Sequence, residues 1–234
     1  MDKENELIYI NSDYDIYRLS LETETKIPLL QTNSSTWKPH CVYCSPFSMD
    51  LLVGMFRKDL KIGIVTRYSN SGKLKQSIIC DKFGQELYNE PRYITENNNG
   101  DVVVSDSDWE TGAVVVTDRG GQHRFTYTGD PSGSGLLPRG ICTDGLSHII
   151  VCDSSSKKIH VIDEDGRFLS YIFINSKLMS EASCLSYAFP DDLFLVGSYY
   201  GNKIGVCKYV AEKIEANTDK TECRFFLYGN TPCI

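Results

Sequence analysis

The sequence predicts an all-β protein, a β-propeller built from repeated four-stranded sheets. Two stretches, 91–106 and 138–153, align without a gap at a spacing of 47 residues, and each begins with Pro-Arg-x-Ile. In both, a polar turn leads into a run rich in Val, Ile and Asp that is followed by Ser. A repeat of this length, with short β-branched runs between Gly, Asp and Ser turns, is typical of a propeller blade. Because such a sheet has two apolar faces, we expect each copy to pack against neighbouring copies.

About five copies of this repeat are visible along the chain, and the first lacks its first strand. The expected blades have these bounds: 1–36 (partial), 37–90, 91–137, 138–179 and 180–210. Residues 211–234 are expected to form a tail or a closing strand, in which Arg224–Tyr228 would add to the first blade. The repeat count leaves open whether the ring is complete or partial.

Composition supports a folded protein in a reducing compartment. Charged residues make up an ordinary 24% of the chain, and no low-complexity block is present. No apolar run is long enough to cross a bilayer, and residues 1–6 lack the features of a secretory signal. Nine cysteines, several of them within apolar runs, indicate reduced thiols. We therefore predict a cytoplasmic protein without a membrane partner.

Several segments together resemble the NHL-repeat β-propeller of the tripartite-motif proteins. The segments that carry the resemblance are 37–56, 91–106, 112–118, 138–144 and 159–169. The likeness runs from about residue 6 to residue 209. It implies a six-bladed ring that docks protein partners or RNA. In full-length relatives this ring follows RING, B-box and coiled-coil modules, so the resemblance implies the recognition module of an E3 ubiquitin ligase.

No catalytic module is visible in the sequence itself. A RING needs several zinc-ligand pairs, whereas His40, Cys41 and Cys44 stand alone, so ubiquitination would belong to a longer parent protein. The sequence contains neither G-x-S-x-G nor H-E-x-x-H, and its histidines fall in different repeats. We therefore predict no enzymatic activity, no metal, no cofactor and no small-molecule substrate.

A minor alternative is a calcium-dependent, lactonase-like hydrolase, because lactonases of this kind also use propellers. Asp106, Asp108 and Glu110 are grouped in one predicted turn, and calcium favours clusters of oxygen ligands. Their spacing does not complete an EF-hand loop, and Asp is common in turns that bind no ion.

The repeat geometry predicts a partner-binding face. In a propeller, the start of the innermost strand and the turn between the second and third strands open on the same face. The residues expected there are His40, Arg92, Arg139, Tyr14, Lys58, Trp109, Lys157 and Tyr200. Aromatic rings beside Arg and Lys are typical of protein-binding hot spots. The same mixture suits single-stranded RNA, which is the alternative partner, although a net charge of −7 opposes it.

A structural role competes with binding at these positions. Arg92 and Arg139 would then bond carboxylates of neighbouring blades, and the Tyr and Trp side chains would shield blade edges.

Overall fold

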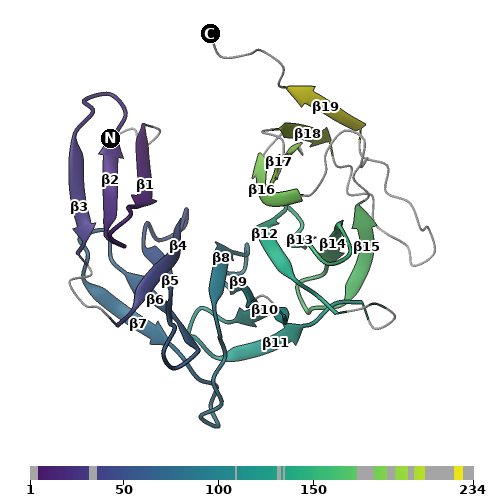
Figure 1. Cartoon of the computed structure of the whole chain (residues 1–234), viewed down its shortest axis with the longest axis horizontal. Coiled ribbons are helices and arrows are strands. Elements are labelled where there is room, and N and C mark those ends of the chain that lie inside the picture. The colour runs from purple at the N-terminus through teal and green to yellow at the C-terminus, as the bar shows by residue number, and fades with distance from the viewer. Residues whose placement is uncertain are drawn as a thin grey trace.

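The computed structural model is an all-β arc of five antiparallel sheets, as predicted (Figure 1). The structure describes residues 5–31, 36–108, 110–130, 133, 135–172, 182–188, 193–199, 203–208 and 224–228. Within these residues, no helix has the length and apolar character needed to span a membrane.

Each sheet is made of strands that follow one another in the chain. The first sheet has three strands, β1 (Glu6–Ile10), β2 (Ile16–Ser20) and β3 (Lys26–Leu30). The second has four, β4 (Lys38–Cys44), β5 (Leu51–Arg57), β6 (Ile62–Tyr68) and β7 (Leu74–Ile78). The third contains β8 (Pro91–Glu96), β9 (Val102–Ser107), β10 (Gly112–Thr117) and β11 (His123–Tyr127). The fourth contains β12 (Pro138–Thr143), β13 (Ile149–Asp153), β14 (Lys158–Ile162) and β15 (Phe168–Ile172). The fifth contains β16 (Ala182–Ala188), β17 (Leu193–Ser198), β18 (Ile204–Lys208) and β19 (Arg224–Tyr228).

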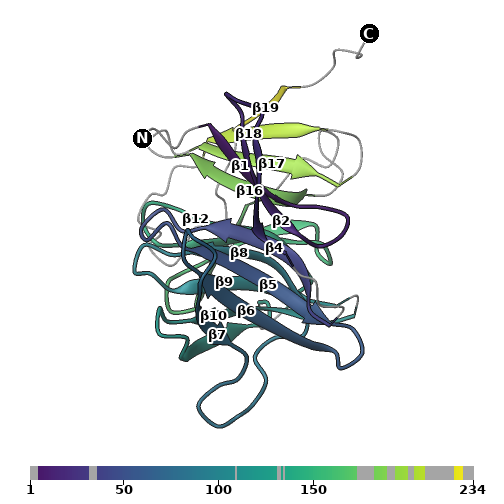
Figure 2. The same ribbon diagram turned by 90° about the vertical axis from the view of Figure 1, so that its left-hand side faces the viewer.

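The first strands of the second to fifth sheets lie on the inside of the arc. Strand β4 lies beside β8, β8 beside β12, and β12 beside β16. Figure 2 shows the same arrangement from the side of the first and second sheets. The repeat found in the sequence therefore corresponds to one sheet, and the sheets are arranged about a shared axis.

The core consists of apolar layers between neighbouring sheets. Leu52 and Val65 of the second sheet pack against Ile94 and Val104 of the third, and the layer excludes water almost completely. Strands β9 and β13 are buried at every residue, and β5 is buried at all but its last two residues. Burial on both faces explains why these strands are continuous runs of Val, Ile and Leu rather than alternating patterns.

The repeated proline has a packing reason. A Cβ atom added to Gly63 would lie 2.5 Å from Cδ of Pro91, and one added to Gly112 would lie 2.4 Å from Cδ of Pro138. The glycine near the start of β6, and the one at the start of β10, therefore leave room for the proline that begins the next inner strand. This contact sets how closely successive sheets approach at this end.

The first and fifth sheets form the two ends of the arc (Figure 1). The expectation that Arg224–Tyr228 closes onto the first sheet is wrong, because this segment pairs with β18 and is the fourth strand of the fifth sheet. Pairing with the preceding strand closes a much shorter loop than pairing across the whole chain, so it costs less conformational entropy.

Candidate partner-binding site

The strand register defines one end of the sheets, which we call the proline end. Pro91 lies opposite Asp106, and Pro138 lies opposite Asp153, so each inner strand begins where the second strand ends. The turn between the second and third strands is therefore at the same end as the start of the inner strand, as the sequence predicts. Side chains from several sheets meet on this end.

Arg92 is held at the proline end by three partners. Its Nη2 lies 2.9 Å from Oε2 of Glu90, and its Nε donates a hydrogen bond of 3.1 Å to the carbonyl oxygen of Ser107. Its Nη1 lies 3.4 Å from Nε2 of His40, which belongs to the second sheet. The His40 ring also approaches Glu90, with 3.5 Å between Nδ1 and Oε1. Arg92 therefore joins two sheets through His40, whereas its carboxylate partner, Glu90, lies two residues before it in the chain.

Aromatic rings and cations alternate beside this cluster. The His40 and Phe56 ring centroids are 5.1 Å apart. Arg57 Cζ lies 5.8 Å from the ring centroid of Trp37. In the same way, Lys38 Nζ lies 4.8 Å from the ring centroid of Tyr14, which is in the turn between β1 and β2. These distances are within or near the range of cation–π and aromatic pairs.

These side chains form one surface because the strand register brings them together. Lys38 lies opposite Phe56 in the β4–β5 pair, and Arg57 follows Phe56 directly. We call this surface the aromatic–basic patch and define it by seven residues: Tyr14, Trp37, Lys38, His40, Phe56, Arg57 and Arg92. It draws on the first, second and third sheets.

His40 is neutral within the patch. Burial, followed by the positive charge of Arg92, lowers the pKa of the His40 imidazole to about 4. The patch therefore owes its positive charge to Lys38, Arg57 and Arg92, in part offset by Glu90 and Asp59.

An NMR titration of the His40 ring is expected to show one transition near pH 4. In urea-unfolded protein, the same ring should titrate near pH 6.5. Since the pKa is lower in the folded state, protonation of His40 should destabilise the fold as the pH falls from about 6.5 to about 4. A folded-state transition above pH 6 would show that Arg92 and burial do not govern this ring.

The acidic residues at this end serve as hydrogen-bond acceptors. Asp106 accepts from the backbone amides of Asn89 and Glu90, at 2.9 and 2.7 Å, and so fixes the segment that leads to Arg92. Burial raises the pKa of Asp106 to about 6. Asp108 accepts from the amides of Glu110 and Thr111, so it caps its own turn. Among the described residues, no group of three or more His, Cys, Asp or Glu side chains is placed to hold a metal ion.

The other predicted site residues are spread more widely. Lys58 is exposed in the turn that follows Arg57. Arg139 and Lys157 lie at the proline end of the fourth sheet, farther along the arc. Trp109 and Tyr200 lie outside the described residues. Sequence reasoning missed Trp37, Lys38, Phe56 and Arg57. The run WKPH at the start of the second blade is the signal in the sequence that could have revealed Trp37 and Lys38.

Left-handed backbone recurs in the turns of this end. Tyr14, Lys61 and Lys157 have φ angles of 66°, 55° and 58°, and each lies at or near the end of the turn between a second and a third strand. Side chains with a Cβ atom rarely adopt this conformation, and it clusters at functional sites. The turn geometry therefore fixes where these side chains project.

The inner strands enclose a second concave surface. It is a groove of about 340 Å³ between the first strands of the second to fifth sheets. Six of the residues that line it are of hydroxyl-bearing types: Tyr43, Tyr93, Thr95, Thr143, Ser186 and Tyr187. Three of these six residues are tyrosines, which come from the second, third and fifth sheets.

Comparison of the sequence with family models and with curated proteins gives no match. Solved structures do resemble the chain. A streptogramin B lyase has a TM-score of 0.67 at 14% identity and covers 99% of this chain and 67% of its own. A virginiamycin B lyase from Staphylococcus aureus has a TM-score of 0.63 at 16% identity, with coverages of 94% and 68%. A calcium-binding protein, regucalcin, from Agrobacterium tumefaciens has a TM-score of 0.59 at 15% identity, with coverages of 85% and 67%.

These likenesses establish the fold. The chain spans about two thirds of the length of the structures it resembles. They are β-propeller proteins, so the propeller part of the resemblance seen in the sequence is confirmed. Membership of the NHL and tripartite-motif family stays a prediction.

The prediction of no enzymatic activity is corrected by the same structures. Two of them are lyases, so a chain with this fold can be an enzyme. The physical reason is that a propeller can assemble a catalytic site from single residues on different sheets, which leaves no short motif in the sequence. The absence of such motifs was therefore no argument against catalysis.

Proposed function

We propose that the aromatic–basic patch binds a protein partner, and that the chain is the substrate-recognition part of a tripartite-motif ubiquitin ligase. One observation carries the proposal: three pairs of side chains from the first and second sheets lie next to Arg92 of the third sheet. Two of the pairs place a cation over an aromatic ring, and the third is formed by two rings. Trp, Tyr and Arg are the residues that dominate protein-binding hot spots.

Preorganisation of the patch supports this role. Arg57 is held by Asp59, with 2.8 Å between Nη2 and Oδ2, and Arg92 is held by Glu90. Side chains already held in place lose less conformational entropy when a partner binds. Trp37 also packs on the core between the first and second sheets, so its ring has a fixed position.

The thiols support a reducing compartment such as the cytoplasm. Five cysteines within the described residues are free thiols: Cys41, Cys80, Cys142, Cys152 and Cys184. Burial raises the pKa of Cys41 to about 12, which keeps it a neutral thiol packed between sheets.

Single-stranded RNA is the second candidate for the same patch. Bases stack on exposed rings such as Tyr14 while phosphates meet Lys and Arg, and the patch offers both. The acidic net charge of −7 favours the protein partner over RNA.

A matched pair of double variants tests the proposal. In the patch variant Tyr14→Asn/Arg57→Glu, Asn keeps the left-handed backbone at position 14 while the ring and the cation are removed. The control variant Phe47→Asn/Arg119→Glu removes an exposed ring and a cation in turns at the opposite end. We expect partners recovered by the wild-type protein to fall at least tenfold with the patch variant, and less than twofold with the control. Equal recovery by the two variants would overturn the proposal.

Arg92 is a poor choice for this test. Its guanidinium is bonded to Glu90, Ser107 and His40, so Arg92→Glu would loosen the join between two sheets as well as change the surface. Denaturant unfolding midpoints of both double variants should be measured first, and we expect them to lie close to the wild type.

An RNA arm separates the two candidates. Fluorescence anisotropy with a labelled single-stranded RNA at low salt should show no binding if the partner is a protein. RNA would be favoured if the protein binds it with a log affinity that falls linearly with log salt concentration. This binding should then be lost in the patch variant and kept in the control variant.

A further inference from the structure

Among the described residues, the first sheet has no strand in the innermost place that β4, β8, β12 and β16 occupy in the other four. Among the described strands, β1 pairs with β2 alone, so its other edge is open. Each of the remaining described strands already has a place in a sheet, and β19 belongs to the fifth. No described segment of the chain is left to cover the open edge.

The hydrogen-bond pattern shows which backbone groups face this edge. Asn11 N donates a hydrogen bond of 2.9 Å to Asp15 O, so the backbone groups of Asn11 face β2. The direction of the N–H and C=O groups alternates along an antiparallel strand, so the residues of β1 two and four positions before Asn11 also face β2. The N–H and C=O groups of Glu6, Ile8 and Ile10 therefore point away from β2, to the open edge. These are the groups that an added strand would bond.

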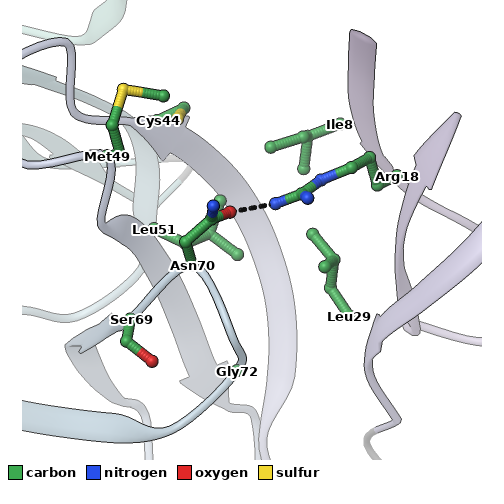
Figure 3. A pocket seen from close by; sticks show the side chains of 9 residues that line it. All are labelled: Ile8, Arg18, Leu29, Cys44, Met49, Leu51, Ser69, Asn70 and Gly72. Atoms are coloured by element: carbon green, nitrogen blue, oxygen red, sulfur yellow. Dashed lines mark hydrogen bonds between the residues drawn. The ribbon is translucent and has the colours of Figure 1, made fainter. Parts of the chain in front are cut away.

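A groove of about 330 Å³ lies beside this edge, between the first and second sheets. Its lining includes residues of both sheets: Glu6, Ile8, Arg18, Val42, Tyr43, Cys44, Met49 and Asn70. Figure 3 shows the adjoining pocket, where Arg18 of β2 donates a hydrogen bond to Asn70 of the second sheet, with Ile8, Leu29 and Leu51 around them. The lining of the groove thus combines apolar residues, such as Ile8, Val42 and Met49, with the polar residues Glu6, Arg18 and Asn70.

The other sheets show what kind of strand fits this place. In three of them the inner strand has the pattern Pro-x-x-Val or Pro-x-x-Ile: Pro39 to Val42, Pro91 to Ile94 and Pro138 to Ile141. The aliphatic residue lies opposite the middle of the second strand each time, as in the pairs Val42–Val53, Ile94–Val104 and Ile141–Val151.

We propose that an extended segment of a partner protein, with the pattern Pro-x-x-Ile or Pro-x-x-Val, adds to the open edge of β1 as a fourth and innermost strand. It would run antiparallel to β1, starting at the proline end, as the inner strands of the other sheets do. Main-chain bonds to Glu6, Ile8 and Ile10 give affinity, and the groove selects the side chains. This site goes beyond the patch and needs none of its residues.

The probe is a fluorescein-labelled peptide with the sequence of residues 89–97, which holds Pro91 and Ile94. In the third sheet Asn97 N donates to Asp101 O, so the backbone groups of Thr95 face the second strand and those of Ile94 face away. We expect saturable binding by fluorescence anisotropy. N-methylation at the Thr95 position should weaken binding at least tenfold, and N-methylation at the Ile94 position less than threefold.

Two variants of the protein isolate the edge itself. Ile8→Pro removes an N–H that only an added strand would use, and proline is tolerated on strand edges of this kind. Ile8→Ala loses the same side-chain packing but keeps the N–H. Peptide affinity should be at least tenfold lower for Ile8→Pro than for Ile8→Ala, and both variants should keep the β-sheet signal in circular dichroism.

Three results would overturn the proposal: no peptide binding, equal effects of the two methylations, or equal affinity of the two Ile8 variants. A chain that sediments as a dimer, and becomes monomeric with Ile8→Pro, would assign the edge to a second copy instead. The variant Tyr14→Asn/Arg57→Glu should bind the peptide normally, so failure of the patch and failure of the edge can be told apart.

Discussion

Arg67→Met is expected to lower the free energy of unfolding by about 3–5 kcal/mol, because it leaves a buried carboxylate without its cation. Arg67 Nη2 in β6 lies 2.8 Å from Oε1 of Glu96 in β8, and the side chains are only 7% and 3% exposed. Asp50 is a weaker partner, 3.9 Å from Nη1. The pair joins the second and third sheets.

A double variant separates the ion pair from packing. Replacing both partners, in Arg67→Met/Glu96→Met, removes the stranded charge, so this protein should be more stable than Arg67→Met alone. Urea unfolding followed by fluorescence measures both. If Arg67→Met costs less than about 1 kcal/mol, the pair is screened by solvent and does not hold the sheets together.

Gly140→Ala is expected to cost about 3 kcal/mol, because it forces the fourth and fifth sheets apart. A Cβ atom at this position in β12 would lie 2.4 Å from Cα of Cys184 and 2.7 Å from the amide nitrogen of Leu185 in β16. Both are backbone atoms, so no side-chain rotation can relieve the overlap. Hydrogen exchange should quicken in β16 and β17 before it does in β5.

The control is Gly120→Ala, in an exposed turn. Its added Cβ would meet only the Asp118 side chain, at 3.2 Å, and that carboxylate can move. We expect a change in the free energy of unfolding below about 0.5 kcal/mol. Similar losses for the two variants would mean that the close approach of β12 and β16 is not needed for stability.

The repeat made most of the fold predictable from the sequence. The shared Pro-Arg-x-Ile opening made the third and fourth sheets predictable, and the buried runs of Val, Ile and Leu made the second predictable as well, since each sheet forms from adjacent strands. Strand β19 was misplaced because its pairing depends on a neighbour, β18, rather than on its own pattern. The open edge of β1 was foreseen only as a missing strand.

The site was predictable in part. His40 and Arg92 follow the repeated proline, so their common end could be inferred from the repeat. Trp37 and Arg57 could not, because their meeting depends on the β4–β5 register. The Arg67–Glu96 pair was also missed, since it links strands of different sheets and neither residue has an unusual sequence setting.

Hydrogen exchange with and without a captured partner tests the central claim, that the proline end of the first three sheets is the binding surface. Protection on binding is expected in residues 11–15, 37–40, 56–61 and 90–92, which carry or adjoin the patch. Protection confined to the opposite end, at 45–50, 97–101 and 144–148, would contradict it.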